Sequence, residues 1–549
     1  MASAAWGGRW RELSAARRVE PNGSRVESRL TVQDAAIAGL IFAVVAGYLT
    51  LLPRNLSGAD ESVYLYEAKR VLEGEVPYRD VFEITTPGWL YLMAALFRLF
   101  GVTLATARFA MAVLHGLSAA ALYATCRRLG VRWSFAWLAP LAYLLVCQPA
   151  WPIASQHWLG TFLTIGLLLS CAALPGRRAS WALLPGIVVG LLIAVLQQRG
   201  VFVGSGVAVW LVADRLLLRR YADDADAPAL GAQLALLAVG AALVVVPMAA
   251  GLIASAGFAP VWQALVIHPL FNYRRFTQAT WGQQGALLSA QAAYTFPRLL
   301  KYLPLIVAFD LLRLAILLVR RRQCGEARRL MLLVVFCVTS TLSILYFPDY
   351  IHIAFIAPPF FVAGAESVER GARAWLADSR AWRVAAPLLA AAVLALAGVR
   401  LQQNLVRSRA AFPVSRETAF GHVDWATPFE AHLHDTVRGL METVPSRELF
   451  CYPILSSLYL TVGAHNPTRF QFLLPAYSGP AQMEEVIGVL ERRKLPYIVA
   501  LTGFVAADDP VVAYLRRDYE PMLEAGDVGS VIFRRKAPAP PTPATADDA

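Results

Sequence analysis

Apolar runs separated by short polar connections recur from residue 35 to residue 399. Each run is long enough, or nearly long enough, to cross the hydrocarbon core of a bilayer as a helix. Hydrophobic residues make up 57% of the chain and charged residues 16%, whereas soluble domains are about a quarter charged. We therefore expect a polytopic α-helical membrane protein with about eleven spans. The predicted spans are Ala35–Leu52, Leu104–Cys126, Phe135–Cys147, Leu159–Leu174, Leu183–Leu196, Val201–Val212, Leu234–Ala254, Tyr302–Val319, Leu330–Leu345, Ile351–Ala365 and Val384–Val399.

Arginine clusters between these runs predict the orientation, because loops that stay in the cytoplasm retain Lys and Arg. With a cytoplasmic amino terminus every cluster falls on the same side, and an odd number of spans places everything after Val399 outside. The first run is too long for the core of a signal peptide and lacks a small-residue cleavage site, so we expect an uncleaved span. The clusters are Arg127–Arg128–Arg132, Arg177–Arg178, Arg215–Arg219–Arg220, Arg320–Arg321–Arg322–Arg328–Arg329 and Arg370–Arg373–Arg380–Arg383.

Composition changes along the chain predict its domain organisation. Soluble composition returns after residue 400, where strand-like Leu449–Pro453 and Tyr497–Leu501 surround a helical pattern, Met483–Arg493, as in a small α/β domain. The predicted regions are a basic cytoplasmic amino terminus (1–32), a transmembrane domain (33–400), an extracytoplasmic α/β domain (401–536) and a Pro/Ala/Thr-rich disordered tail (537–549). The protein is thus expected in the cell membrane as a multi-pass protein.

The net charge of +12 does not indicate nucleic-acid binding, because the arginines lie between apolar runs and no Lys/Arg stripe interleaved with aromatic residues appears elsewhere. Five of the six cysteines lie in or beside apolar segments, and Cys451 stands alone in the terminal region. We therefore expect neither a disulfide framework nor a structural zinc site.

The first outer loop, residues 53–101, concentrates acidic residues at the predicted outer membrane surface. Asp60 and Glu61 follow the first span within a few residues, so a carboxylate can be held where a lipid head group would lie. Ser62–Leu72 has an amphipathic pattern, and such helices usually lie flat on the membrane. A solvated surface loop is the alternative interpretation. The charged residues of this loop are Arg54, Asp60, Glu61, Glu67, Lys69, Arg70, Glu73, Glu75, Arg79, Asp80 and Glu83.

The motifs of this loop, together with the span that precedes it, resemble those of the GT-C glycosyltransferases. They are Asp60-Glu61-x-x-Tyr64, Gly74-x-x-Pro77-Tyr78-x-Asp80, a Pro87-Gly88 turn and Leu99-Phe100-Gly101 before an arginine. The similarity is greatest to the protein mannosyltransferase branch, which includes bacterial enzymes that modify lipid A. Where many members have His-Pro-Pro or Lys-Pro-Pro, this chain has Thr86-Pro87-Gly88.

The resemblance implies a polytopic GT-C fold and a sugar donor linked to polyprenyl phosphate. The acceptor, a lipid, a glycan or a protein, would receive the sugar on the outer side of the membrane. Asp60 would be the general base, with Glu61 and Asp80 as its neighbours in the site. A sugar hydroxyl or amine must lose a proton as it attacks the anomeric carbon, and a carboxylate can take that proton.

Cations at the outer surface are the candidates for contact with the phosphate of the donor, because the lipid phosphate departs with negative charge. Lys69 lies in the first outer loop. Arg274 and Arg275 form the only adjacent arginine pair in the predicted outer loops before the last span, with an outer-face salt bridge as the alternative role. Arg199 lies between two apolar runs, and ionisable groups at such depth are functional candidates.

Asp349 and His352 open the tenth predicted span from outside, within Phe347-Pro348-Asp349-Tyr350-Ile351-His352. Asp349 can cap the helix, and His352 can hydrogen-bond either the carrier phosphate or another helix. Similar residues are frequent in the family that the chain resembles.

The sequence leaves two questions open, namely whether the protein binds a divalent cation and whether it has a function other than sugar transfer. Asp60, Glu61 and Asp80 are oxygen donors of the type that hard cations prefer. A transporter or flippase of lipid-linked saccharides would share the basic outer loops, although such proteins usually contain internal repeats, and we find no convincing repeat in this sequence. A structural subunit is a third interpretation, which predicts no dependence on any single carboxylate.

Overall fold

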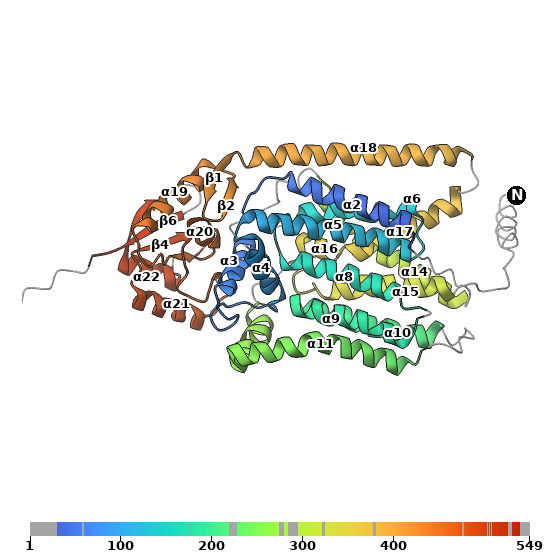
Figure 1. The fold of residues 1–549 in the computed structure, drawn as a ribbon, viewed down its shortest axis with the longest axis horizontal. Helices are drawn as coiled ribbons and strands as arrows, with labels where there is room; N and C mark the ends of the chain where they lie inside the picture. Colours follow the sequence, from blue (N-terminus) through green and yellow to red (C-terminus); the bar gives the residue numbers. More distant parts are fainter. Residues whose placement is uncertain are drawn as a thin grey trace, which may run out of the picture.

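The structure is a computed structural model that describes residues 30–56, 60–175, 177–218, 228–273, 279–283, 295–320, 324–376, 380–474, 477–501, 503, 505–506, 508–524 and 530–537. It consists of an elongated bundle of helices with a smaller mixed α/β part at one end (Figure 1).

Each of the eleven predicted spans is helical over most of its length. The first begins at a capping box, in which the Thr31 hydroxyl accepts a hydrogen bond from the Asp34 N–H and the Asp34 carboxylate accepts one from the Thr31 N–H. The bundle elements are α2 (Val32–Thr50), α5 (Leu104–Arg128), α6 (Trp133–Ala136), α7 (Leu138–Ala142), η1 (Tyr143–Cys147), α8 (Gln156–Ala172), η3 (Ala179–Ala182), α9 (Leu183–Val195), α10 (Gln197–Ala213), η4 (Asp214–Leu218), α11 (Leu230–Ala256), α14 (Leu303–Arg320), α15 (Cys324–Leu342), α16 (Tyr350–Ile356), α17 (Pro358–Leu376) and α18 (Arg380–Ala411).

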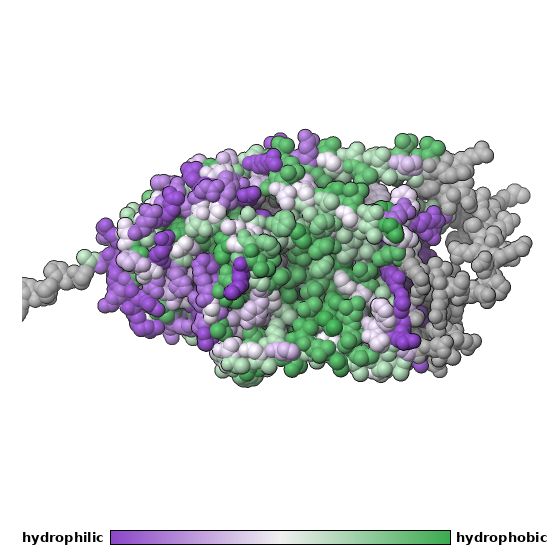
Figure 2. Space-filling view, viewed as in Figure 1, coloured by the Kyte–Doolittle hydropathy of each residue, from purple (hydrophilic) through white to green (hydrophobic). Residues whose placement is uncertain are grey.

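Six helices of the described chain are long and apolar enough to cross a membrane, and a seventh candidate is the pair α16 and α17, bent by 64°. The count of eleven therefore stays a prediction. The outer helices of the bundle present large apolar side chains to their surroundings; Leu388 and Leu389 of α18, for example, are 65% and 56% exposed. Figure 2 shows the result on one face, a hydrophobic zone between two hydrophilic ends, which matches the solvent change across a bilayer.

Ion pairs connect arginines of the predicted clusters to acidic residues near helix ends. Arg127 pairs with Asp34 at the start of α2 (2.5 Å), and Arg328 pairs with Asp214 (2.5 Å). These contacts join helix ends at the end of the bundle away from the α/β part (Figure 1). The paired arginines of the clusters used to predict the orientation therefore lie at one end of the bundle. The assignment of that end to the cytoplasm stays a prediction.

The carboxyl-terminal part contains a two-stranded sheet and a four-stranded sheet with order β3-β4-β6-β5. Strands β3 and β4 are parallel, and the other pairs are antiparallel. The two strands and the helix that the sequence predicts here are confirmed as β3, β4 and α21. The elements are β1 (Val414–Thr418), β2 (Gly421–Trp425), α19 (Pro428–Glu442), β3 (Phe450–Tyr452), α20 (Ser456–Val462), α21 (Pro480–Arg493), β4 (Tyr497–Leu501), α22 (Pro510–Asp518), β5 (Tyr519–Glu524) and β6 (Ser530–Arg535).

Helix α3 (Asp60–Leu72) occupies the junction between the bundle and the α/β part, where it packs against α4 (Gly88–Phe100) and α20. The predicted amphipathic helix is confirmed, while its orientation relative to the membrane stays a prediction. Leu65, Tyr66 and Ala68 are fully buried, and Tyr66 stacks on Tyr459 with ring centroids 4.7 Å apart. The α/β part thus covers α3 on the side of Tyr66.

The remaining short helices lie in the connections of the bundle. They are η2 (Gln148–Ala150), α12 (Phe258–Trp262), η6 (Gln263–Tyr273) and η8 (Pro297–Tyr302).

Candidate active site

Asp60 is the first residue of α3, where its negative charge is favoured by the helix dipole. Its side chain is partly buried, and burial raises the pKa of its carboxyl to about 6. The charges of Glu83 and Asp349 also raise this pKa, and His352 opposes them. The fold therefore brings Asp60 into one electrostatic environment with residues far away in the sequence. A carboxyl that titrates near neutrality can accept a proton during a reaction.

Asp349 and His352 form a hydrogen-bonded pair at the start of α16. The Asp349 carboxylate accepts a hydrogen bond from the backbone N–H of His352 (2.8 Å), so it caps the helix, and it also contacts Nδ1 of the same histidine (2.7 Å). The helix cap and the contact with the imidazole thus share one carboxylate oxygen of Asp349. Its consequence is a fixed orientation of the imidazole ring.

His157, near the start of α8, extends this group of residues into the bundle. Its ring lies 5.4 Å from the ring of His352, measured between centroids, and stacks on Phe355 at 4.6 Å. Sequence reasoning missed His157. The available signal is its position two residues after the cap Ser155, in the first turn of a helix on the same predicted side of the membrane as Asp60.

Arg199 lies in the first turn of α10 and is 4% exposed. Its Nη1 donates to the backbone oxygen of His157 (3.3 Å) and contacts the Thr161 hydroxyl (3.4 Å). Among the described residues no carboxylate lies within ion-pair distance of this guanidinium. Burial of an unpaired charge costs several kcal/mol, so the site favours an anionic ligand at this point.

The Thr85–Gly88 turn docks against the end of α9 and the start of α10. The Thr86 hydroxyl donates to the backbone oxygen of Ile193 (2.6 Å), and Gln197 donates to the backbone oxygen of Ile84 (2.9 Å). A Cβ atom added to Gly88 would lie 2.5 Å from the backbone oxygen of Ala194. The glycine of this turn is therefore required by a close approach of two backbones.

Glu61, the neighbour of Asp60, is fully buried and points to a different set of partners. Arg108 of α5 binds its carboxylate with both terminal nitrogens, one at 2.9 Å, and the backbone N–H of Ala154 donates to it at 2.6 Å. Glu61 thus anchors the start of α3 to the bundle, and in this way it determines where Asp60 lies.

Glu67 and Glu83 form a buried pair behind Asp60, which the sequence showed only as two of many acids. The Glu67 carboxyl hydrogen-bonds to Glu83, and burial, followed by the charge of Glu83, raises the pKa of Glu67 well above its usual value. Glu67 therefore carries the proton of the pair. Glu83 also accepts from the N–H groups of Ile84 (2.7 Å) and Thr85 (2.9 Å), so it orders the turn that contacts α9 and the start of α10.

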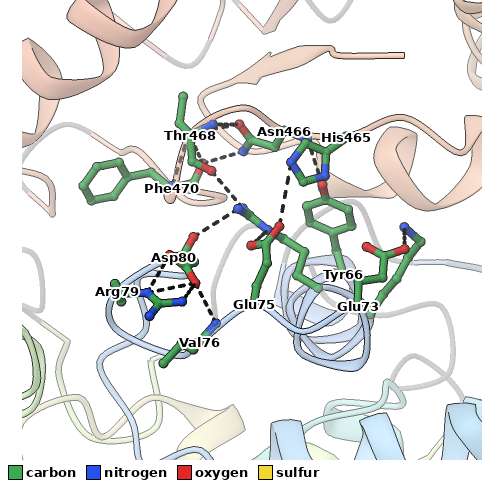
Figure 3. Close-up of polar contacts among 12 residues, drawn as sticks. Tyr66, Glu73, Glu75, Val76, Arg79, Asp80, His465, Asn466, Thr468 and Phe470 are labelled. Atoms are coloured by element: carbon green, nitrogen blue, oxygen red, sulfur yellow. Dashed lines mark hydrogen bonds and ion pairs between the residues drawn. The ribbon is translucent and has the colours of Figure 1, made fainter. Parts of the chain in front are cut away.

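Asp80 and Lys69 lie on the side of the loop that faces the α/β part. Asp80 accepts from the Val76 N–H (2.9 Å) and pairs with Arg79 (2.7 Å), and Lys69 pairs with Glu73 (2.6 Å). Figure 3 shows this region. Neither Asp80 nor Lys69 is among the groups with the largest effects on the pKa of Asp60.

Arg70 links the same part of the loop to the carboxyl-terminal segment. It binds Glu75 (2.5 Å) and the backbone oxygens of Asp80 (3.0 Å) and Thr468 (2.8 Å). These contacts belong to the junction that covers α3 (Figure 3).

Arg274 and Arg275 lie outside the described residues. Close to the Asp349 helix, the described chain forms a cavity of about 300 Å³ lined by two further cations, Arg298 and Lys301, with Tyr350. Neither cation stood out in the sequence, because they are not adjacent to each other.

The three carboxylates considered for a divalent cation do not converge, since Glu61 and Asp80 are engaged by different partners. In the part of the chain that the structure describes, no group of three or more His, Cys, Asp or Glu side chains is placed to hold a metal ion. The described residues thus show no shared site for Asp60, Glu61 and Asp80, and the divalent cation stays a prediction.

Comparison with known proteins supports the fold. No protein-family model matches the chain, and no curated protein sequence does. Among solved structures, ArnT from Cupriavidus metallidurans bound to undecaprenyl phosphate is similar with a TM-score of 0.53 and 14% sequence identity, over 91% of this chain and 97% of ArnT. The apo state of the same protein matches with the same values. The fold expected from the first outer loop is thus confirmed, and the chain is a multi-pass membrane protein with an ArnT-like fold.

Proposed function

We propose that the protein is a membrane glycosyltransferase that moves a sugar from a polyprenyl-phosphate-linked donor to an acceptor on the outer side of the membrane. The observation that carries the proposal is Arg199, a buried guanidinium without a carboxylate partner among the described residues, in contact with His157. His157 adjoins His352, and His352 is an electrostatic neighbour of Asp60. A site for an anion and a carboxyl that can accept a proton thus belong to one continuous group.

The chemistry follows from these two groups. The acceptor oxygen or nitrogen attacks the anomeric carbon and gives its proton to Asp60, while the bond between the anomeric carbon and the phosphate oxygen breaks. The departing lipid phosphate keeps the electron pair of that bond, and Arg199 stabilises its charge. Asp349 fixes His352 beside the reacting groups, and Glu61 positions Asp60. The fold shared with ArnT, which was solved with undecaprenyl phosphate bound, supports a polyprenyl-phosphate donor.

Replacement of Asp60 by Asn tests the role of the base. A folded Asp60→Asn protein should lose at least about a hundredfold in sugar transfer from a polyprenyl-phosphate donor in proteoliposomes, the usual contribution of a positioned base. Glu73→Gln, in the turn directly after α3 but exposed and paired with Lys69, is the matched control and should keep its activity. Full transfer by Asp60→Asn would falsify the role of Asp60. Movement of the lipid-linked saccharide across the bilayer without any transfer by the wild type would favour the transporter instead.

Asp80→Asn in the same assay tests the sequence prediction for Asp80. Since Asp80 is engaged by Arg79 and by a backbone N–H, we expect a smaller loss than for Asp60. A loss equal to that of Asp60→Asn would give Asp80 a direct role. Assays with and without a chelator test the divalent cation.

The contact with the donor phosphate is tested by Arg199→Gln, which should raise the apparent KM for the donor about tenfold or more, the scale of one charge-assisted hydrogen bond. The double variant Arg274→Gln/Arg275→Gln tests the other predicted cations in the same way. An unchanged donor KM in Arg199→Gln would remove Arg199 from the site.

A further inference from the structure

A second cavity, of about 550 Å³, lies where α2 and α18 meet the β1–β2 hairpin. Leu51 and Leu52 follow the end of α2, Arg409 and Phe412 mark the end of α18, and Glu417, His422 and Asp424 come from the hairpin. In Figure 1 this junction is at the end of α18 next to β1 and β2. None of these residues belongs to the group around Asp60.

The cavity lies at the edge of the apolar surface of two candidate membrane spans, α2 and α18. The two helices are joined near this end, because Asn404 donates a hydrogen bond to the Tyr48 hydroxyl (2.7 Å). On the α2 side Val44 and Leu51 are 56% and 50% exposed, and on the α18 side Val406 is 56% exposed. Acyl chains can therefore lie along the same surface that leads into the cavity.

The polar wall of the cavity contains both basic and acidic side chains. Arg409 donates two hydrogen bonds to the Leu51 carbonyl (2.9 and 3.2 Å), and the neighbouring Arg54 is exposed, with no carboxylate within ion-pair distance among the described residues. On the hairpin side, His422 contacts Glu417 (2.8 Å) and Asp424 (3.2 Å) through its two ring nitrogens.

The backbone makes this wall rigid. The Arg54 N–H donates to the Asp424 carboxylate (2.8 Å), the Asp424 N–H donates to the Arg54 carbonyl (3.0 Å), and the Ser415 hydroxyl donates to Asp424 (2.6 Å). Asp424 is thus occupied by structural contacts. The Glu417 carboxylate, 79% exposed, is the acid that remains accessible to a ligand.

We propose that this cavity binds a phospholipid whose head group holds both a phosphate and a primary ammonium, as phosphatidylethanolamine does. The phosphate lies at Arg54 and Arg409, the ammonium donates to Glu417, and the acyl chains follow the exposed apolar faces of α2 and α18. An anionic glycerol head group satisfies the arginines but leaves Glu417 facing a group without positive charge. A choline head group carries the charge but has no N–H to donate.

Native mass spectrometry of the detergent-purified full-length protein, titrated with defined lipids, tests the proposal. The wild type should retain dioleoyl phosphatidylethanolamine about threefold to fivefold better than the phosphatidylcholine or phosphatidylglycerol with the same chains, the scale of one exposed ion pair. Glu417→Gln should abolish this preference. Arg54→Gln should weaken the retention of phosphatidylethanolamine and phosphatidylglycerol alike.

Two variants serve as controls. Glu484→Gln removes an exposed acid of α21, and Arg298→Gln removes an exposed cation of the other cavity, so both should keep the wild-type preference. Both test variants change exposed side chains, and an unchanged thermal transition checks that they fold. Equal retention of the three lipids by the wild type, or an unchanged preference in folded Glu417→Gln, would overturn the proposal. The sugar-transfer assay plays no part in this test, so its outcome is independent of the proposed function.

Discussion

The pH dependence of sugar transfer reports directly on the environment of Asp60. The proposed reaction needs this side chain as a carboxylate, so activity should rise as the pH increases through the pKa of the group. Burial raises that pKa to about 6, and the charges of Glu83 and Asp349 act in the same direction. An ordinary aspartate would already be ionised about two pH units lower.

The size of the effect follows from this value. With a pKa of about 6, roughly a tenth of the sites would be active at about pH 5 and roughly nine tenths at about pH 7. Two variants should shift the acidic limb of the pH–activity curve, the part in which activity rises with pH, in opposite directions. Glu83→Gln removes a negative charge that raises the pKa and should shift the limb to lower pH, whereas His352→Gln removes the opposing group and should shift it to higher pH.

The assay is the initial rate at limiting donor and acceptor, because kcat/KM reports the ionisation of the free enzyme. Proteoliposomes with a polyprenyl-phosphate-linked sugar would be assayed from about pH 5 to about pH 8, with protein stability checked at each pH. A limb near the value of an ordinary aspartate, or a limb that neither variant moves, would refute the electrostatic reasoning.

Two further predictions concern the scaffold of the site. Arg108→Met should destabilise the protein by about 3 to 5 kcal/mol, because it leaves the fully buried Glu61 carboxylate without its counter-ion. A thermal inactivation assay measures the loss of stability. The double variant Arg108→Met/Glu61→Gln should recover most of that loss. A single variant as stable as the wild type would contradict the structural role of the pair. Gly88→Ala should lower the stability of the protein by about 1 to 3 kcal/mol through overpacking against the Ala194 carbonyl. The control Gly47→Ala, with open space around its Cβ, should not destabilise the protein. Equal stability of the two variants would show that the close approach at Gly88 is absent.

The sequence predicted most of the elements of the fold because their signals are local. Apolar runs, arginine clusters and the strand pattern at Tyr497–Leu501 depend on neighbouring residues along the chain, and the corresponding helices and strand are present. The motifs of the first outer loop are also local. Asp60, which belongs to one of them, is the first residue of a helix.

Contacts between distant residues decided the rest. The sequence does not show whether a carboxylate meets an arginine or a histidine, so it grouped Glu61 and Asp80 with Asp60 in one predicted site. The packing of α3 then turned Glu61 towards Arg108, left Asp80 with Arg79, and placed Asp60 near His352.

The burial of α3 and the position of Arg199 beside His157 likewise depend on how separate elements pack. A period of 3.6 residues indicates which face of a helix is apolar, but it does not say what covers the polar face. The sequence by itself determined a polytopic membrane protein with acids gathered in its first outer loop. Only the tertiary structure decided which of those acids lies near His352, because that proximity depends on packing between residues far apart in the chain.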